Sequence, residues 1–219
     1  MYQYAYTAHG LREELETYFK EQHLHQAQAA LEYAWQQHAG TTRINGQPFI
    51  VHPLFVAKYS IMIGANSEDQ ICTALLHDVC EDCDIAPNAL PFNPRVQRSV
   101  KHLTFHYDFD AEDSASTRYF KKFLVKRETY ARLIEDSNAL IIKTVDRYHN
   151  LTTAEELSEK NIIKNIHETD RWLLPVIEQA LTRKEHQANY HQLYLMSVNL
   201  RSLNNCLALL HHVELDFRA

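Results

Sequence analysis

Apolar residues recur at intervals of three and four over most of the chain, which is the spacing of amphipathic helices. The longest stripes cover residues 9–19, 23–38, 161–181 and 186–215. Another helix is expected over 53–63, where Pro53 suits the first position and Gly64 offers a stop. Ser67, with Gln70 three positions on, forms a capping-box pattern at the start of the next helix. The pattern predicts an all-α protein.

Proline and acidic residues mark the connections between these helices. Three prolines between 87 and 94 exclude a continuous helix there, and a helix resumes over 96–104. Residues 108–117 are polar and acidic without periodicity, so we expect either a mobile lid over a substrate or an ordinary surface loop. Pro175 should kink or restart the third stripe. The last stripe indicates either core packing or a dimerisation helix. Its apolar positions are Leu193, Met196, Leu200, Leu203, Leu207 and Leu210.

Composition narrows the class of protein. A chain of 219 residues supports one sizeable core with appendages, or at most two small domains. With 4 glycines and no Gly-rich phosphate loop, dinucleotide folds are not expected. The formal net charge of −6 argues against a nucleic-acid surface. No signal peptide or membrane-spanning run is found, so we expect a cytoplasmic protein without a membrane partner. Cys80 and Cys83 lack a second Cys-x-x-Cys pair and are interpreted as ordinary reduced thiols.

The segment 77–82 carries an unusual concentration of metal-binding side chains. His77 and Asp78 are adjacent, and Glu81 and Asp82 follow one helical turn later. On a continuous helix Glu81 would stack near His77 and Asp82 near Asp78. Carboxylates at this spacing repel one another, and burying them without a cation is costly. The segment therefore indicates half of a metal site.

Two other segments offer the remaining ligands. His52 immediately precedes the predicted helix start at Pro53, and Asp146 shares one helix face with Asn150 and Thr153. His52, His77, Asp78 and Asp146 form a mixed imidazole and carboxylate set. Such a set suits Mn²⁺, Fe²⁺ or Zn²⁺ better than a structural thiolate site does.

The segments 43–53, 77–82 and 143–150 resemble, in this order, those of the HD superfamily of metal-dependent phosphohydrolases. The first segment, residues 43–53, is similar to the family's Arg-Lys-Ser-Gly-Glu-Pro-Tyr-Ile-x-His-Pro. The second, residues 77–82, is similar to the family's His-Asp-Val-Val-Glu-Asp. The third, residues 143–150, is similar to the family's Lys-Leu-Ala-Asp-Arg-Leu-His-Asn. The chain looks most similar to the hydrolase domain of the RelA/SpoT alarmone enzymes, which remove pyrophosphate from the 3′ position of (p)ppGpp. The resemblance implies an HD-domain helical bundle over 22–180. It leaves 1–21 as an N-terminal helical extension and 181–219 as a C-terminal helix that packs on the core or on a partner subunit, in a possible homodimer.

Carried over by position, the resemblance gives each matched residue a role. It implies that one divalent ion, with Mn²⁺ favoured, is held by His52, His77, Asp78 and Asp146. It makes Glu81 and Asp82 the acidic pair that handles the attacking water. It makes the substrate contacts Arg43, Asn150 and Thr153.

Three departures from the family pattern bear on the substrate. Ile44 replaces a basic residue that helps to hold the base, Asn45 replaces a serine, and Thr152 replaces an arginine. These departures leave the residues of the implied chemistry intact. They do not fix whether the protein recognises guanine. Lys143 either helps to neutralise phosphate or is a solvated surface lysine. The histidines outside the three ligand segments, and His149 within the third, match no ligand pattern.

The resemblance implies hydrolysis of the 3′-pyrophosphate of (p)ppGpp-like alarmones, giving GDP or GTP, or the adenosine counterpart, and pyrophosphate. One alternative is a phosphatase acting on another nucleotide, such as the 2′-phosphate of NADPH, and Ile44 supports it. Another is a non-catalytic nucleotide-binding module. The metal set and the acidic pair argue against this module, because a sensor has no need of them.

Overall fold

A computed structural model describes residues 7–43 and 46–215. In these residues the chain is helical without a strand, apart from an isolated antiparallel bridge between Thr42 and Pro48. The α-helices are α1 Ala8–Glu21, α2 His25–Gln37, α3 Val51–Met62, α4 Glu68–Leu76, α5 Val79–Asp82, α6 Pro94–Leu103, α7 Ala115–Arg132, α8 Ser137–Thr152, α9 Glu159–Glu168, α10 Leu174–Leu181 and α11 Tyr190–Leu210. The all-α prediction is confirmed.

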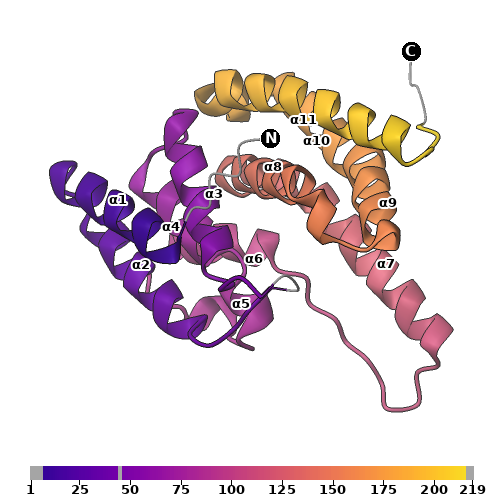
Figure 1. Ribbon diagram of the computed structural model, residues 1–219, viewed down its shortest axis with the longest axis horizontal. Coiled ribbons are helices and arrows are strands. Elements are labelled where there is room, and N and C mark those ends of the chain that lie inside the picture. The colour runs from indigo at the N-terminus through magenta and orange to yellow at the C-terminus, as the bar shows by residue number, and fades with distance from the viewer. Residues whose placement is uncertain (1–6, 44–45, 216–219) are drawn as a thin grey trace.

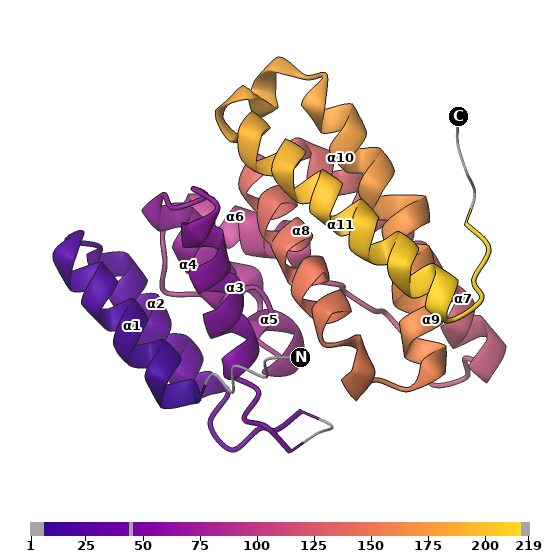
Figure 2. The same cartoon turned by 45° about the horizontal axis from the view of Figure 1, so that its top comes forward.

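The helices pack around the pair α3 and α4 and the long central helix α8 (Figures 1 and 2). α3 packs against both α4 and α8, while α1 covers α3 and α2 covers α4. On the other side, α11 runs along α8 and also contacts α10. One hydrophobic cluster joins residues from α1 to α11. The domain boundaries after residues 21 and 180 stay a prediction.

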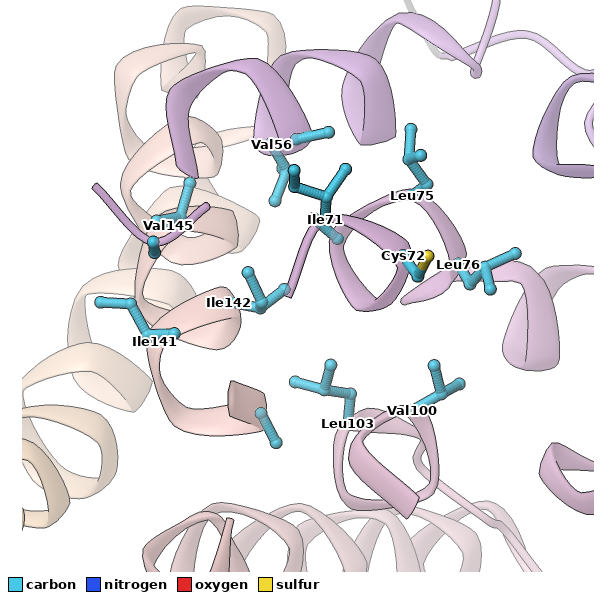
Figure 3. Close-up of a cluster of buried hydrophobic side chains, with 14 of the residues drawn as sticks. Val56, Ile71, Cys72, Leu75, Leu76, Val100, Leu103, Ile141, Ile142 and Val145 are labelled. Carbon is cyan, nitrogen blue, oxygen red and sulfur yellow. The ribbon is translucent and has the colours of Figure 1, made fainter. Parts of the chain in front are cut away.

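The centre of the core is made by four helices whose apolar faces meet (Figure 3). Val56 of α3, Ile71 and Leu75 of α4, Val100 of α6 and Ile142 of α8 are all fully buried. Burial of such side chains stabilises the fold by about 1.5–3 kcal/mol each. This packing fixes the relative positions of α3, α4 and α8, on which the candidate site is built.

Local signals fix several helix ends. The Ser67 hydroxyl accepts from the Gln70 N–H and the Gln70 side chain accepts from the Ser67 N–H, so the predicted capping box is confirmed. Gly64 has φ +85° just after α3, as a helix stop requires. The start of α3 differs from the prediction, because it begins at Val51 rather than Pro53. Pro53 is tolerated there since N–H groups in the first turn have no partner within the helix.

Three further expectations concern the C-terminal half. Pro175 lies in the first turn of α10, just after a π-helical turn over Thr169–Leu173, so the predicted restart is confirmed. Leu193, Met196 and Leu200 are buried, as core packing of α11 requires. Leu210, at the end of this stripe, is 72% exposed and does not pack in the core, and the dimerisation alternative stays a prediction.

The predicted loop at 108–117 lies nearer the N-terminus than expected, because the non-helical residues 104–114 separate α6 from α7. It ends at Ser114, whose hydroxyl caps α7 by accepting from the Thr117 N–H. Residues 115–117 were therefore assigned wrongly, and the N-cap signal of Ser114 explains why. The lid role of the loop stays a prediction. No helix in the described part of the chain is long and apolar enough to cross a membrane.

Candidate metal centre

Four polar side chains meet where α3, α4 and α8 pack together. His52 is the second residue of α3, His77 and Asp78 join α4 to α5, and Asp146 lies in the middle of α8. Ligand atoms of His52, His77 and Asp146 all lie within 4.8 Å of one another, and all three residues are buried. Asp78, whose side chain is 23% exposed, completes the group.

The distances show convergence on a common point. His52 Nε2 lies 3.1 Å from Asp146 Oδ1 and 3.4 Å from Asp78 Oδ2. His77 Nε2 lies 3.1 Å from Asp78 Oδ2 and 3.2 Å from His52 Nε2. Two imidazole nitrogens and two carboxylates that face one another in a buried position form a donor set that fits a divalent cation.

The backbone around His77 and Asp78 departs from the continuous helix that the sequence predicted. α4 ends at Leu76 and α5 begins at Val79. The Ala74 carbonyl, which a continuous helix would use for the Asp78 N–H, lies 2.8 Å from His77 Nδ1. Because a carbonyl can only accept, His77 Nδ1 donates, and its Nε2 is the nitrogen that faces the site and would offer a lone pair to a cation once deprotonated.

The interactions between these side chains favour the charged forms of His77, Asp78 and Asp146 over their neutral forms. Burial opposes the charge on His77, but Asp78 raises the pKa of His77 to about 9. Burial likewise opposes ionisation of Asp78 and Asp146, yet His77 and His52 lower the pKa of Asp78, and Lys143 with the two histidines lowers that of Asp146. A bound cation and the proton on His77 therefore compete for the same place.

Asp146 is held at both of its oxygens. Its Oδ2 accepts from Lys143 Nζ at 2.8 Å, and its Oδ1 accepts from Asn150 Nδ2 at 2.7 Å. The side chain of Lys143 is 12% exposed and lies 5.2 Å from the centre of the Phe105 ring. The alternative of a solvated surface lysine is therefore wrong, because Lys143 is the buried counter-ion of Asp146.

Glu81 and Asp82 lie in α5, directly after the two adjacent ligand candidates. Glu81 Oε1 accepts from the Phe105 N–H at 2.7 Å, which anchors this carboxylate to the loop after α6. Burial raises the pKa of Glu81 to about 7, against the opposing effects of Lys143 and the Phe105 N–H. Burial and Asp78 raise the pKa of Asp82 to about 6. Both carboxyls can therefore exchange protons near neutral pH.

Comparison with known proteins agrees with this geometry. The HD-domain family model matches residues 30–171, more than half of the chain. The chain belongs to the HD-domain family. HD domains bind divalent metal ions, and in this one His52, His77 and Asp146 lie close enough together to hold an ion.

The curated relatives of this HD domain are longer proteins. A guanosine-3′,5′-bis(diphosphate) 3′-pyrophosphohydrolase of Aquifex aeolicus is 31% identical over 164 residues, which cover 73% of this chain and 22% of the relative. One of the same name from Vibrio cholerae is 28% identical over 68% of this chain and 21% of the relative. A GTP pyrophosphokinase of Myxococcus xanthus is 30% identical over 63% of this chain and 18% of the relative. The chain thus spans about a fifth of the length of these relatives.

The predicted substrate contacts differ in how directly they are connected to the candidate metal centre of the HD domain. Arg43 donates to Asn150 Oδ1 at 3.5 Å, across 107 positions of sequence, and Asn150 in turn holds Asp146. The hydroxyl of Thr153 donates to the His149 carbonyl at the end of α8. The Thr152 hydroxyl donates to the same carbonyl and contributes no positive charge. Their substrate roles stay predictions. The departures Ile44 and Asn45 lie outside the described residues.

His149, which matches no ligand pattern in the sequence, lies against the ligand group in the structure. His149 Nδ1 lies 2.7 Å from His52 Nδ1, on the side of the ring away from the other ligand candidates. Burial, together with His52 and Arg43, lowers the pKa of His149 to about 2, so it is neutral. A signal was present, because His149 follows Asp146 by three positions and therefore lies on the same face of α8.

Proposed function

We propose that this HD domain hydrolyses the 3′-pyrophosphate of (p)ppGpp-like alarmones, with release of pyrophosphate and GDP, GTP or the adenosine counterpart. The observation that carries the proposal is the convergence of the four ligand candidates beside two carboxyls with raised pKa values. The printed names of the relatives supply the substrate class.

The proposed ligands of the divalent ion are His52, His77, Asp78 and Asp146. When bound, the ion supplies Lewis acidity for the phosphoryl group and makes water a stronger nucleophile near neutral pH. We propose Mn²⁺, which the family resemblance favours among the ions that a mixed imidazole and carboxylate set suits. Lys143 and Asn150 hold the Asp146 carboxylate in one orientation. Such outer partners fix ligand geometry.

The acidic pair handles the protons of the reaction. Water attacks the phosphorus attached to the 3′ oxygen, and the bond between that phosphorus and the 3′ oxygen breaks. One proton of the water passes to a carboxylate of the pair, and a proton is delivered to the leaving 3′ oxygen. Glu81, with a pKa of about 7, and Asp82, with a pKa of about 6, are suited to both transfers at neutral pH. Arg43 and Asn150 would contact the nucleotide at the rim.

Product analysis by ion-exchange chromatography tests the proposal. The purified protein with Mn²⁺ is given ppGpp, ppApp or NADPH, and Asp78→Ala serves as the ligand variant. We expect pyrophosphate and nucleoside diphosphate from ppGpp or ppApp, with a rate ratio that reports the base preference. Inorganic phosphate from NADPH alone would reassign the protein as a nucleotide phosphatase.

A pair of double variants separates an enzyme from a binding module. Glu81→Gln with Asp82→Asn should lower kcat by at least about 100-fold, since general acid–base catalysis contributes that much. The matched control Glu13→Gln with Glu14→Gln removes two adjacent exposed carboxylates of α1, a helix that carries none of the site residues. It should leave turnover unchanged. Equal turnover of both double variants would contradict the role of the acidic pair, and no turnover by the unaltered protein would leave the non-catalytic module.

A further inference from the structure

The imidazole of His52 has different surroundings at its two nitrogens. Nε2 faces Asp146 Oδ1 at 3.1 Å and Asp78 Oδ2 at 3.4 Å. Nδ1 faces away from these carboxylates and lies 2.7 Å from Nδ1 of His149. Both histidines are buried. The His52 ring therefore connects the ligand group to a second histidine on α8.

A contact of 2.7 Å between two ring nitrogens requires that one of them carries a proton and the other does not. Two lone pairs at this distance would repel, so one nitrogen must donate and the other accept. As a metal ligand, His52 needs the lone pair of Nε2, and its proton then lies on Nδ1. His149 Nδ1 is consequently the acceptor, and neutral His149 carries its own proton on Nε2.

The His149 ring is fixed by its neighbours. It packs on the Phe55 ring with 4.2 Å between ring centres, and the His52 ring lies beside it with 4.9 Å between ring centres and 28° between the ring planes. It also follows Asp146 by one turn of α8. The same helix therefore supplies one ligand candidate directly and reaches a second one through His149. His149 is not itself in the group that could hold an ion among the described residues.

The two histidine ligand candidates are thus supported in parallel ways. His77 donates from Nδ1 to the Ala74 carbonyl, and His52, when it binds the ion through Nε2, donates from Nδ1 to His149. Metal-bound histidines commonly donate their other N–H to a carboxylate, a carbonyl or a water. A neutral imidazole in this place adds no negative charge to a site that already has four carboxylates.

We propose that His149 is a positioning residue of the metal centre, which accepts the Nδ1 proton of His52 and so fixes the tautomer and the orientation of that ligand. This inference rests on the metal centre of the proposed function. Loss of such an outer partner lowers metal affinity by about 10–100-fold. The effect should therefore appear in metal binding itself, before any turnover is measured.

Two variants of His149 and one control test the inference. His149→Phe keeps a ring against Phe55 but removes the acceptor, whereas His149→Asn keeps an acceptor near the position of Nδ1. His191→Phe makes the same replacement at an exposed histidine of α11. Metal-free protein is titrated with Mn²⁺, and the free ion is counted by electron paramagnetic resonance. We expect the Kd to rise about tenfold or more in His149→Phe. It should stay within a few-fold of the unaltered value in His149→Asn and in the control.

A second measurement needs no variant and decides the question even if His149→Phe fails to fold. Long-range ¹⁵N–¹H spectra of the unaltered protein loaded with diamagnetic Zn²⁺ report the histidine tautomers. We expect the His52 proton on Nδ1 and the ion on Nε2. An unchanged Kd in His149→Phe, or a His149 proton on Nδ1, would overturn the role of His149 alone, whereas a His52 proton on Nε2 would also remove His52 from the proposed ligands. Failure of the unaltered protein to bind any divalent ion would remove the proposed function together with this inference.

Discussion

Replacement of Lys143 by methionine tests the electrostatic design of the site. Lys143 Nζ lies 2.8 Å from Asp146 Oδ2, and the two side chains are 12% and 5% exposed. Methionine keeps most of the aliphatic length but leaves the carboxylate without its counter-ion. Removal of one partner of a buried pair costs about 3–5 kcal/mol. Because Asn150 still donates to Asp146 Oδ1, we expect the lower end, about 3 kcal/mol.

The assay is urea denaturation at pH 7 in EDTA, followed by circular dichroism. The matched control is Arg201→Met, which breaks an exposed pair with Glu178 whose side chains are 47% and 57% exposed. Such surface pairs contribute about 0–1 kcal/mol. A loss in Lys143→Met no larger than that of the control would refute the assignment of Lys143 as the buried counter-ion.

The pH dependence of this loss provides an internal check. In the unaltered protein the pKa of Asp146 is lowered, so the ionised carboxylate stabilises the fold above its unfolded pKa of about 4. That contribution is lost as the pH falls below this value. The difference in the free energy of unfolding between Lys143→Met and the unaltered protein should therefore be largest at pH 7 and become smaller below about pH 4. Added Mn²⁺ should also narrow it, since the cation replaces the lost positive charge.

Three further predictions follow from other parts of the structure. Glu168→Gln weakens the buried pairing with Arg147 and Lys126 and should lower the free energy of unfolding by about 3 kcal/mol in urea denaturation; a change below 1 kcal/mol would contradict it. Ser67→Ala removes the capping box of α4 and should cost about 1 kcal/mol by thermal denaturation, whereas no shift in Tm would show that the cap contributes nothing. Because Asp78 raises the pKa of His77 to about 9, Mn²⁺ binding should weaken from pH 8 to pH 6 in calorimetric titrations; equal affinity at both pH values would contradict this.

Short-range signals were readable from the sequence because adjacent residues determine them. The capping box of Ser67 and Gln70 and the stop at Gly64 depend on hydrogen bonds and backbone angles within one turn. The helix break after Leu76 was not predicted, although it is equally local. It depends on the His77 ring reaching the Ala74 carbonyl, and residue spacing does not show such a bond.

The features that the sequence did not predict depend on contacts between residues far apart in the chain. The burial of Lys143 requires Phe105, which arrives from the loop after α6 and packs over it. The place of His149 depends on the packing of α3 against α8, which brings it to His52 across 97 positions. The gathering of His52, His77 and Asp146 was expected from the family resemblance, and the structure shows the packing that brings these three together.

The most direct test of the account is the fate of ppGpp in ¹⁸O-labelled water, followed by ³¹P NMR with the protein and Mn²⁺. The account predicts pyrophosphate that carries one ¹⁸O, because water attacks phosphorus and the 3′ oxygen leaves with the nucleoside. EDTA should abolish the signal, and Asp78→Ala should reduce it strongly. Unlabelled pyrophosphate, monophosphate alone, or turnover that persists in EDTA would contradict a metal-dependent hydrolysis at this centre.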